Sequence, residues 1–242
     1  GGKETTIPVT LPVTTELMKL LGYYVAEGHA DERQVGFTFD SHEQSLIQTT
    51  ERALAEVGSE TTTVERDRNS TRVKAFGSPI SLFLERLCGA RAQEKRVPEF
   101  VFRVEPRYQR AFIQAVYEGD GSDAHPSNEL SHTTTSETLA RQLSVLWNMQ
   151  GVLASTEVTD SSGYADEPST QYRTKTYGED AQLFDGFEQS PDVGEQGYKR
   201  VPTTLLDDVR IDGPGRETVP DSVPGLLLGA GVGSKLEHAA EY

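Results

Sequence analysis

The chain has 242 residues, of which 35% are hydrophobic, and its 38 Asp and Glu residues outnumber 23 Lys and Arg residues to give a formal net charge of −15. This length allows one large domain or two small ones around a hydrophobic core. No apolar run reaches the roughly 20 residues that cross a bilayer, and no hydrophobic segment of signal-peptide type opens the chain. We therefore predict a soluble, cytoplasmic protein with no membrane partner. The single cysteine, Cys88, excludes an intrachain disulfide and a thiolate zinc site, and favours a buried packing role.

The acidic balance has two interpretations. A net negative surface repels phosphate at ordinary ionic strength, which argues against a nucleic-acid partner. At about 1 M salt the screening length falls to roughly 3 Å, so this repulsion fades and local contacts dominate. The carboxylates are spread along the whole chain instead of forming one acidic tail. We therefore favour adaptation to a salt-rich cytoplasm.

The first half of the chain contains a regular series of predicted elements that ends in Lys-Arg-Val-Pro. Its first helix is capped by Thr14 or Thr15 and ends at Gly28. The later elements are a strand at 35–39, a helix at about 43–57, a hairpin of strands at 61–67 and 71–77, a helix at 78–87, and EKRVP at 94–98.

The second half repeats this order. A helix with Pro106 in its first turn runs to Gly119 and Gly121. The later elements are a strand at 128–134, a helix at 136–150, a hairpin of strands at 154–160 and 171–178, a helix at 180–187, and YKRVP at 198–202. The repeated tetrapeptide therefore closes two copies of one unit, predicted at 1–98 and 99–210, and residues 211–242 are an extension compatible with a closing helix.

The first helix of each unit carries a face without bulky side chains, followed by an acid. Small residues recur four apart at Gly22 and Ala26 and at Ala115 and Gly119, which predicts that the two helices pack closely. The acids Glu27 and Asp120 then follow at the helix C-termini, where the macrodipole disfavours negative charge. Packed helices bring these acids together, so a divalent cation held by carboxylates and backbone carbonyls would relieve their repulsion. The alternative, two solvated helix ends, is less favoured because the arrangement occurs twice.

These stretches, LLGYYVAEG at 20–28 and IQAVYEGDG at 113–121, resemble the two LAGLIDADG motifs of monomeric homing endonucleases. The likeness extends over about residues 10–210 and is closest to intein-encoded members, here with a halophilic archaeal composition. It implies an α+β fold of two pseudo-twofold related αββαββα-like units, with saddle-shaped antiparallel sheets and two central packed motif helices. It also implies cleavage of both strands of a long, asymmetric DNA site, dependent on Mg²⁺ or Mn²⁺. The implied metal-binding residues are Glu27, Asp120, Ala26 and Gly119.

Two lysines occupy matching places in the repeated strands, Lys74 in RVKAFG and Lys175 in RTKTYG. A lysine near the acids can neutralise the charge that develops on phosphorus, so both are catalytic candidates. The alternative is a surface lysine that protects a sheet edge.

Basic residues on strands, turns and linkers are candidates for DNA contact, because arginine reads guanine edges and grips phosphate. These candidates are Arg33, Arg66, Arg68, Arg72, Lys95, Arg96, Arg173, Lys199 and Arg200. The five histidines show no metal-ligand spacing and are interpreted as surface or packing residues, with His29 alone beside the predicted site. Trp147 and Leu143 are interpreted as core residues.

The chain departs from the family in two ways. It begins Gly-Gly-Lys and ends Ala-Glu-Tyr, without the nucleophile and His-Asn pair of a splicing intein, so we expect the endonuclease portion of an intein or a free-standing enzyme. Glu27 adds a methylene to the usual Asp, which is expected to slow cleavage of one strand. Two alternatives to an active nuclease stay open: a decayed relative that binds DNA or RNA without cutting, as a regulator or maturase, and a duplicated module whose partner is a protein.

Overall fold

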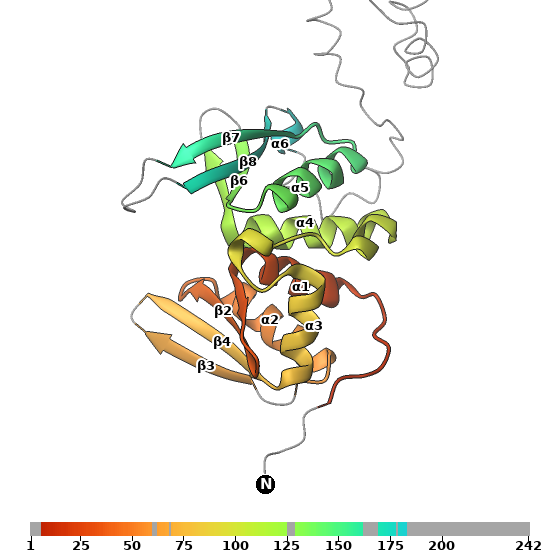
Figure 1. The fold of residues 1–242 in the computed structure, drawn as a ribbon, viewed down its shortest axis with the longest axis vertical. Coiled ribbons are helices and arrows are strands. Elements are labelled where there is room, and N and C mark those ends of the chain that lie inside the picture. Colours follow the sequence, from red (N-terminus) through yellow and green to blue (C-terminus); the bar gives the residue numbers. More distant parts are fainter. Residues whose placement is uncertain are drawn as a thin grey trace, which may run out of the picture.

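The computed structural model describes residues 6–59, 62–67, 69–124, 129–161, 169–177 and 179–182, which form two units of the same architecture. Figure 1 shows one unit below the other, with α1 and α4 between the two sheets. In the first unit the elements are α1 (Thr15–Glu27), β1 (Gly28–Ala30), β2 (Gln34–Asp40), α2 (Gln44–Glu56), β3 (Thr62–Asp67), β4 (Ser70–Phe76) and α3 (Ser78–Cys88).

The second unit repeats this order after a connection that contains two short 3-10 helices, Ala92–Glu94 and Glu99–Arg103. Its elements are α4 (Pro106–Asp120), β5 (Gly121–Ala124), β6 (Glu129–Thr134), α5 (Glu137–Met149), β7 (Ser155–Ser161), β8 (Ser169–Tyr177) and α6 (Glu179–Gln182). The two sheets are antiparallel, with strand orders β1-β2-β4-β3 and β5-β6-β8-β7. The α+β fold with two repeated units is confirmed.

Local signals explain where the long helices begin. The Oγ1 atom of Thr14 accepts a hydrogen bond of 3.0 Å from the backbone of Leu17, and Pro106 occupies the first turn of α4. The hydroxyl of Ser136 accepts from the backbone of Leu139 at the start of α5. The strands β1 and β5 were missed by periodicity, because three and four residues are too few to show alternation.

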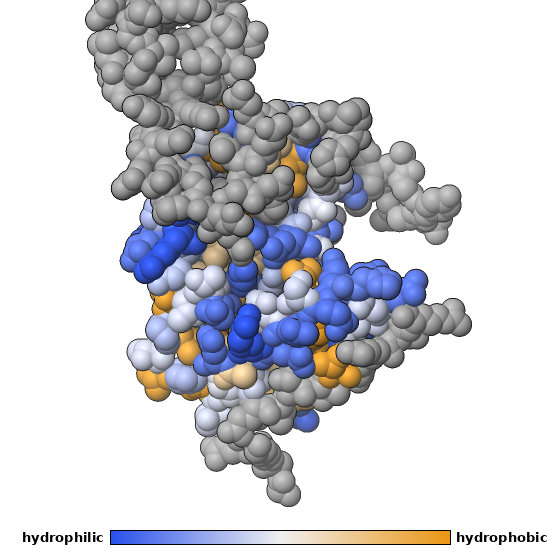
Figure 2. Space-filling view, turned by 180° about the vertical axis from the view of Figure 1, so that it is seen from behind, coloured by the Kyte–Doolittle hydropathy of each residue, from blue (hydrophilic) through white to orange (hydrophobic). Residues whose placement is uncertain are grey.

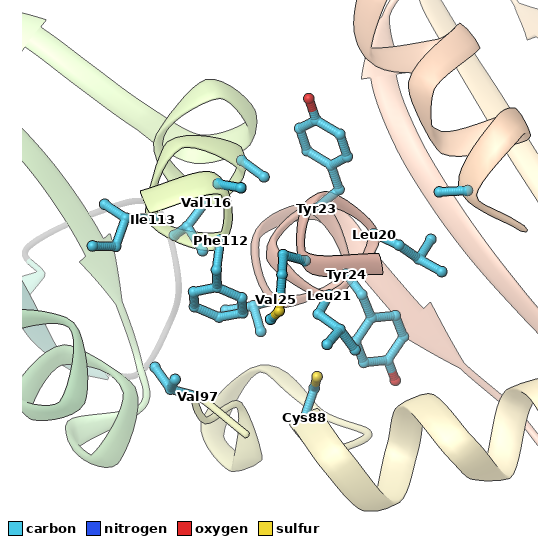
Figure 3. Close-up of a cluster of buried hydrophobic side chains, with 14 of the residues drawn as sticks. Leu20, Leu21, Tyr23, Tyr24, Val25, Cys88, Val97, Phe112, Ile113 and Val116 are labelled. Carbon is cyan, nitrogen blue, oxygen red and sulfur yellow. The ribbon is translucent and has the colours of Figure 1, made fainter. Parts of the chain in front are cut away.

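The two motif helices pack as the small residues predicted. A Cβ atom at Gly22 would lie 2.6 Å from the Cβ of Ala115, and one at Gly119 would lie 2.8 Å from the Cβ of Ala26. Both distances are shorter than a real Cβ contact, so the backbones approach closely only because these positions are glycine. Figure 3 shows the same interface, with Phe112 of α4 beside α1.

The core continues from this interface into both units. Trp147, Leu143 and Cys88 are each 0% exposed, as predicted. The side chain of Val97, from the first Lys-Arg-Val-Pro copy, is 1% exposed and lies near the α1–α4 interface (Figure 3). Figure 2 shows that the described part of the rear face is mostly hydrophilic, with hydrophobic residues in separate groups. Within the described residues, no helix has the length and apolarity to cross a membrane.

Several predictions fall outside the described residues. These are the second Lys-Arg-Val-Pro copy, the extension at 211–242, and the end of the helix predicted at 180–187, of which α6 is the described start. The unit boundaries at 98 and 210 stay predictions.

Candidate metal and nucleic-acid site

Glu27 and Asp120 are the last residues of α1 and α4, and each is followed by a glycine that starts a strand. The φ angles of these glycines, −85° for Gly28 and −82° for Gly121, are ordinary for any residue. Glycine is needed there for space, because a Cβ at Gly121 would lie 2.2 Å from the carbonyl oxygen of Tyr117. The chain therefore turns sharply from helix to strand, and this corner fixes the backbone of each acid.

The two acids are brought together by the helix packing. A Cβ at Gly119 would lie 3.4 Å from the Cγ of Glu27, so the Glu27 side chain extends over the residue that precedes Asp120. Burial, with smaller contributions from the charges of Asp120 and then Glu43, raises the pKa of Glu27 to about 7. Burial also raises the pKa of Asp120, although 56% of its side chain is exposed. The site therefore disfavours two negative charges.

This pair of acids fits a divalent cation, whose charge would relieve the repulsion that raises the pKa of Glu27. Among the described residues, no group of three or more His, Cys, Asp or Glu side chains is placed to hold a metal. Side chains of these types would therefore supply two ligands, and backbone carbonyls and water the others. The carbonyls of Ala26 and Gly119, next to the acids, are the candidates that the sequence named.

The two candidate lysines occupy equivalent positions in the sheets. Lys74 of β4 pairs with Gly36 of β2, and Lys175 of β8 pairs with Ser131 of β6. Gly36 and Ser131 are themselves equivalent. Gly36 precedes Phe37, which pairs with Gly28, and Ser131 precedes His132, which pairs with Gly121; these glycines follow the two acids. Lys74 lies between Val73 and Ala75, which are 0% exposed, so its side chain extends from the sheet face opposite the core.

The outward face of the second sheet holds its basic side chains with carboxylates. The ammonium group of Lys175 forms an ion pair with Glu157, which raises the pKa of this lysine. The guanidinium of Arg173 pairs with Glu129 and also donates to the hydroxyl of Ser131. Both cations are thus held on this face by carboxylates of the neighbouring strands.

His29 lies on the equivalent face of the first sheet. A Cβ at Gly36 would lie 2.5 Å from the Cε1 of His29, so the imidazole covers this glycine. Burial, followed by the nearby charge of Lys95, lowers the pKa of His29. The corresponding residue after Asp120 is Ser122, so the two halves differ here.

The prediction that Lys95 contacts DNA is wrong. Lys95 is 5% exposed, and its Nζ donates to the carbonyl oxygens of Tyr24 at 2.7 Å and Gly28 at 2.8 Å. These carbonyls belong to the C-terminal end of α1, where a cation offsets the helix macrodipole. The ammonium group also lies 3.5 Å from the centre of the Tyr24 ring, and burial lowers the pKa of Lys95 to about 8. Lys95 caps the helix that carries Glu27, because the chain returns to α1 after 71 residues.

The other predicted DNA-contact residues have varied surroundings. Arg72 is exposed on the outward face of β4, and Arg33 is exposed in the β1–β2 connection. The guanidinium of Arg96 donates to the backbone carbonyls of Arg86 and Glu94. The side chains of Arg66, Arg68, Lys199 and Arg200 lie outside the described part of the chain.

His132 is a buried neighbour of Asp120 that the sequence interpretation did not single out. Its Nε2 lies 3.9 Å from Oδ2 of Asp120, its side chain is 2% exposed, and burial lowers its pKa to about 4. An alignment of the strands predicted at 35–39 and 128–134 could have singled out His132, since it occupies the position that Phe37 has in the first unit.

Comparison with known proteins gives a consistent result. A model of the LAGLIDADG-like domain matches residues 14–94 and 107–186. A DNA polymerase of Thermococcus kodakarensis is 35% identical over 162 residues, which are 64% of this chain and 9% of that protein. A DNA gyrase polypeptide of Mycobacterium gordonae is 30% identical over 131 residues, 50% of this chain and 24% of that protein. The chain therefore spans about a tenth of the polymerase and about a quarter of the gyrase polypeptide.

Two solved structures share the fold at low identity. The homing endonuclease I-DmoI in complex with DNA and Mn has a TM-score of 0.55 and 13% identity, covering 74% of this chain and 99% of that one. Full-length WhiA from Thermatoga maritima has a TM-score of 0.51 and 14% identity, covering 93% of this chain and 69% of that one. Because the domain model matches most of both units, this chain belongs to the LAGLIDADG-like domain family.

Proposed function

We propose that this chain is a divalent-metal-dependent endonuclease that cuts both strands of a specific DNA duplex. The observation that carries the proposal is the convergence of Glu27 and Asp120 at the ends of two packed helices, where their charges oppose each other. Such an arrangement lowers stability and is explained if a cation binds there. One chain supplies both acids, which supports a monomer with one acid for each strand.

In this proposal the carboxylates of Glu27 and Asp120, with the carbonyls of Ala26 and Gly119, hold Mg²⁺ or Mn²⁺. When bound, the metal would supply positive charge that stabilises the attacking and leaving oxygens of an in-line displacement at phosphorus. The protein's own contribution is the fixed helix-to-strand corner, which holds each carboxylate at the base of the sheets. Lys74 and Lys175 then supply positive charge toward the scissile phosphates, one in each unit.

The DNA lies against the outward faces of the two sheets in this proposal. Arg72 and Lys74 project from one sheet and Arg173 and Lys175 from the other, at equivalent register. Because the net charge of the chain is −15, the protein as a whole repels DNA, and these local cations attract the DNA phosphates against that repulsion. A salt-rich cytoplasm, inferred from composition, would weaken that opposing field.

We also infer that the gene segment is of intein type. Similar segments occur in a DNA polymerase and a DNA gyrase, and each match spans a minor part of the longer protein. Host proteins with different names and one shared segment are expected when that segment moves between genes. The target would then be the host coding sequence joined without the insertion.

A plasmid that carries this joined sequence tests the proposal. The chain is incubated with it in KCl with Mg²⁺, Mn²⁺, Ca²⁺ or EDTA, and the topology of the plasmid is followed on gels. We expect linear DNA with Mg²⁺ or Mn²⁺ and none with EDTA, and we expect Asp120→Asn to stop linearisation. Cleavage that persists in EDTA, or in the Asp120→Asn and Glu27→Gln variants, would contradict the proposed site.

A second candidate is a member that binds DNA without cutting it. The ion pair between Lys175 and Glu157 favours this candidate, because a lysine already paired with a carboxylate is less available to a phosphate. Gel-shift binding of the joined sequence without nicking in any metal would support it.

A further inference from the structure

His132 and Phe37 occupy the same place in the two units. Phe37 pairs with Gly28, and His132 pairs with Gly121, the glycines that directly follow the two acids. Each ring contacts the equivalent tyrosine of its motif helix, Phe37 with Tyr24 at 6.1 Å and His132 with Tyr117 at 5.8 Å between ring centres. The second unit thus has an imidazole where the first has a phenyl ring of similar shape.

A buried imidazole at this position needs an explanation. Phe37 is 0% exposed, so the backbone here accommodates a wholly apolar ring. His132 is 2% exposed, and its Nδ1 is buried without a hydrogen-bond partner among the described residues. An imidazole that only filled space would lose its hydrogen bonds to water on burial without replacing them, so a phenyl ring at this position would give a more stable fold.

The remaining ring nitrogen faces an acceptor. Nε2 of His132 lies 3.9 Å from Oδ2 of Asp120, which is too long for a hydrogen bond. The imidazole is held by its burial, whereas 56% of the Asp120 side chain is exposed, so a rotamer change of Asp120 would close this gap. Because Nδ1 faces no acceptor, the neutral ring is best protonated at Nε2, which directs an N–H toward the carboxylate.

The acids themselves differ in a way that matches this arrangement. The unit with the imidazole has the shorter acid, Asp120, and the unit with the phenyl ring has the longer one, Glu27. Glu27 extends over Gly119 toward the second unit, and no nitrogen occupies the place of Nε2 behind it, since Phe37 stands there.

We propose that His132 is a positioning residue for Asp120, whose carboxylate it orients through its Nε2–H, and that Glu27 has no such support. This inference rests on the proposed metal-dependent cleavage and adds an asymmetry to it: the two strands are cut by differently organised acids. A hydrogen-bonded partner behind a metal-binding group restricts its orientation, and the loss of such a partner costs about 10-fold to 100-fold in metal affinity or activity.

Imidazole ¹⁵N NMR of the whole chain tests the contact without metal or DNA. We expect a His132 protonated at Nε2, with an Nε2 resonance that shifts in Asp120→Asn and stays in place in Glu27→Gln, the matched change in the other unit. A ring protonated at Nδ1, or an Nε2 resonance that ignores Asp120→Asn, would overturn the proposal. This result does not depend on whether the protein cuts DNA.

Binding of Mn²⁺, followed by its electron paramagnetic resonance signal, tests the consequence. His132→Phe copies the ring of the first unit, and His132→Gln keeps an N–H at similar reach. We expect affinity to fall about 10-fold to 100-fold in His132→Phe and to recover in His132→Gln. Unchanged Mn²⁺ affinity in His132→Phe overturns the positioning role, whereas a wild-type chain that binds no Mn²⁺ contradicts the proposed function instead.

Strand-resolved cleavage of an end-labelled target completes the test. His132→Phe should slow one strand and spare the other, so that nicked duplex accumulates. Equal slowing of both strands together with a lowered Tm would show that His132 has only a packing role.

Discussion

The two halves share a backbone and differ in the side chains around their acids. In the first half Phe37 pairs with Gly28, the residue after Glu27, and His29 covers Gly36 on the outward face. In the second half Asp120 lies near His132, and Ser122 and Ser131 stand where the first half has His29 and Gly36. The features that both halves need, namely the small-residue helix faces, the acid–glycine corner and the paired lysines, are the ones the halves share. The side chains next to each acid differ, so the proposed mechanism predicts that each half cuts its own strand at its own rate.

The largest effect is expected from the acids. In the proposed mechanism Asp120→Asn and Glu27→Gln each remove a charged metal ligand worth several kcal/mol to the transition state, so each should slow cleavage of one strand by about 10²-fold to 10³-fold. Folding should be intact, because each change removes one of two repelling charges. Strand-resolved cleavage and thermal unfolding measure both effects. If one variant slows both strands equally, the two acids do not act on separate strands and the comparison fails.

The lysines should have a smaller effect. A hydrogen bond to a charged group is worth about 1.5–3 kcal/mol, so Lys74→Met and Lys175→Met should each slow one strand by about 10-fold to 100-fold. Glu157→Gln is the matched variant for the second half, since it releases Lys175 from its ion pair. Single-turnover cleavage rates measure the effect. Unaltered rates in both lysine variants would mean that Lys74 and Lys175 are surface lysines of the sheets without a role in cleavage.

Lys95→Met should affect stability rather than DNA affinity. The change removes the buried lysine donor from the carbonyls of Tyr24 and Gly28, of which Tyr24 keeps only its bond from the Gly28 backbone, and should lower the free energy of unfolding by about 2–4 kcal/mol. Arg33→Ala, at an exposed residue, is the control and should weaken DNA binding with little change in stability. Urea unfolding and salt-dependent binding separate the two. A normal unfolding midpoint in Lys95→Met would remove the capping role.

Glu27 should give a pH dependence that Asp120 modifies. Its pKa is about 7 in the fold and 4.5 for an unperturbed glutamate, so between these pH values the folded chain binds the extra proton. The stability of wild type in EDTA should therefore fall as pH rises from about 4.5 to about 7 and level off above that. Glu27→Gln should remove this slope, and Asp120→Asn should shrink it, because the charge of Asp120 contributes to the raised pKa. Chemical unfolding across this pH range measures it, and identical slopes in all three proteins would mean that Glu27 is not perturbed.

Salt concentration should affect cleavage of the two strands almost equally, because the net charge of −15 is spread over the whole chain. Folded fraction should rise toward about 1 M KCl as carboxylates are screened, while binding per folded molecule weakens by counterion release. Cleavage of both strands should then peak together at high KCl. Circular dichroism and plasmid cleavage over one KCl series test this. A chain that is fully folded at about 0.1 M and cuts best there would contradict the salt-adapted interpretation.

The sequence alone determined the duplication, the two packed helices, the acids at their ends and the matched lysines. Each of these features depends on local spacing and is written twice, so one copy supports the interpretation of the other. Only the tertiary structure decided the role of Lys95, which looked like a DNA contact in an acidic chain and instead caps α1 from 71 residues away. The same is true of His132 beside Asp120 and of Lys175 beside Glu157, because burial and the identity of a partner depend on which segments the fold brings together. Short strands such as β1 also form only against a neighbour, since three residues carry no pattern of their own.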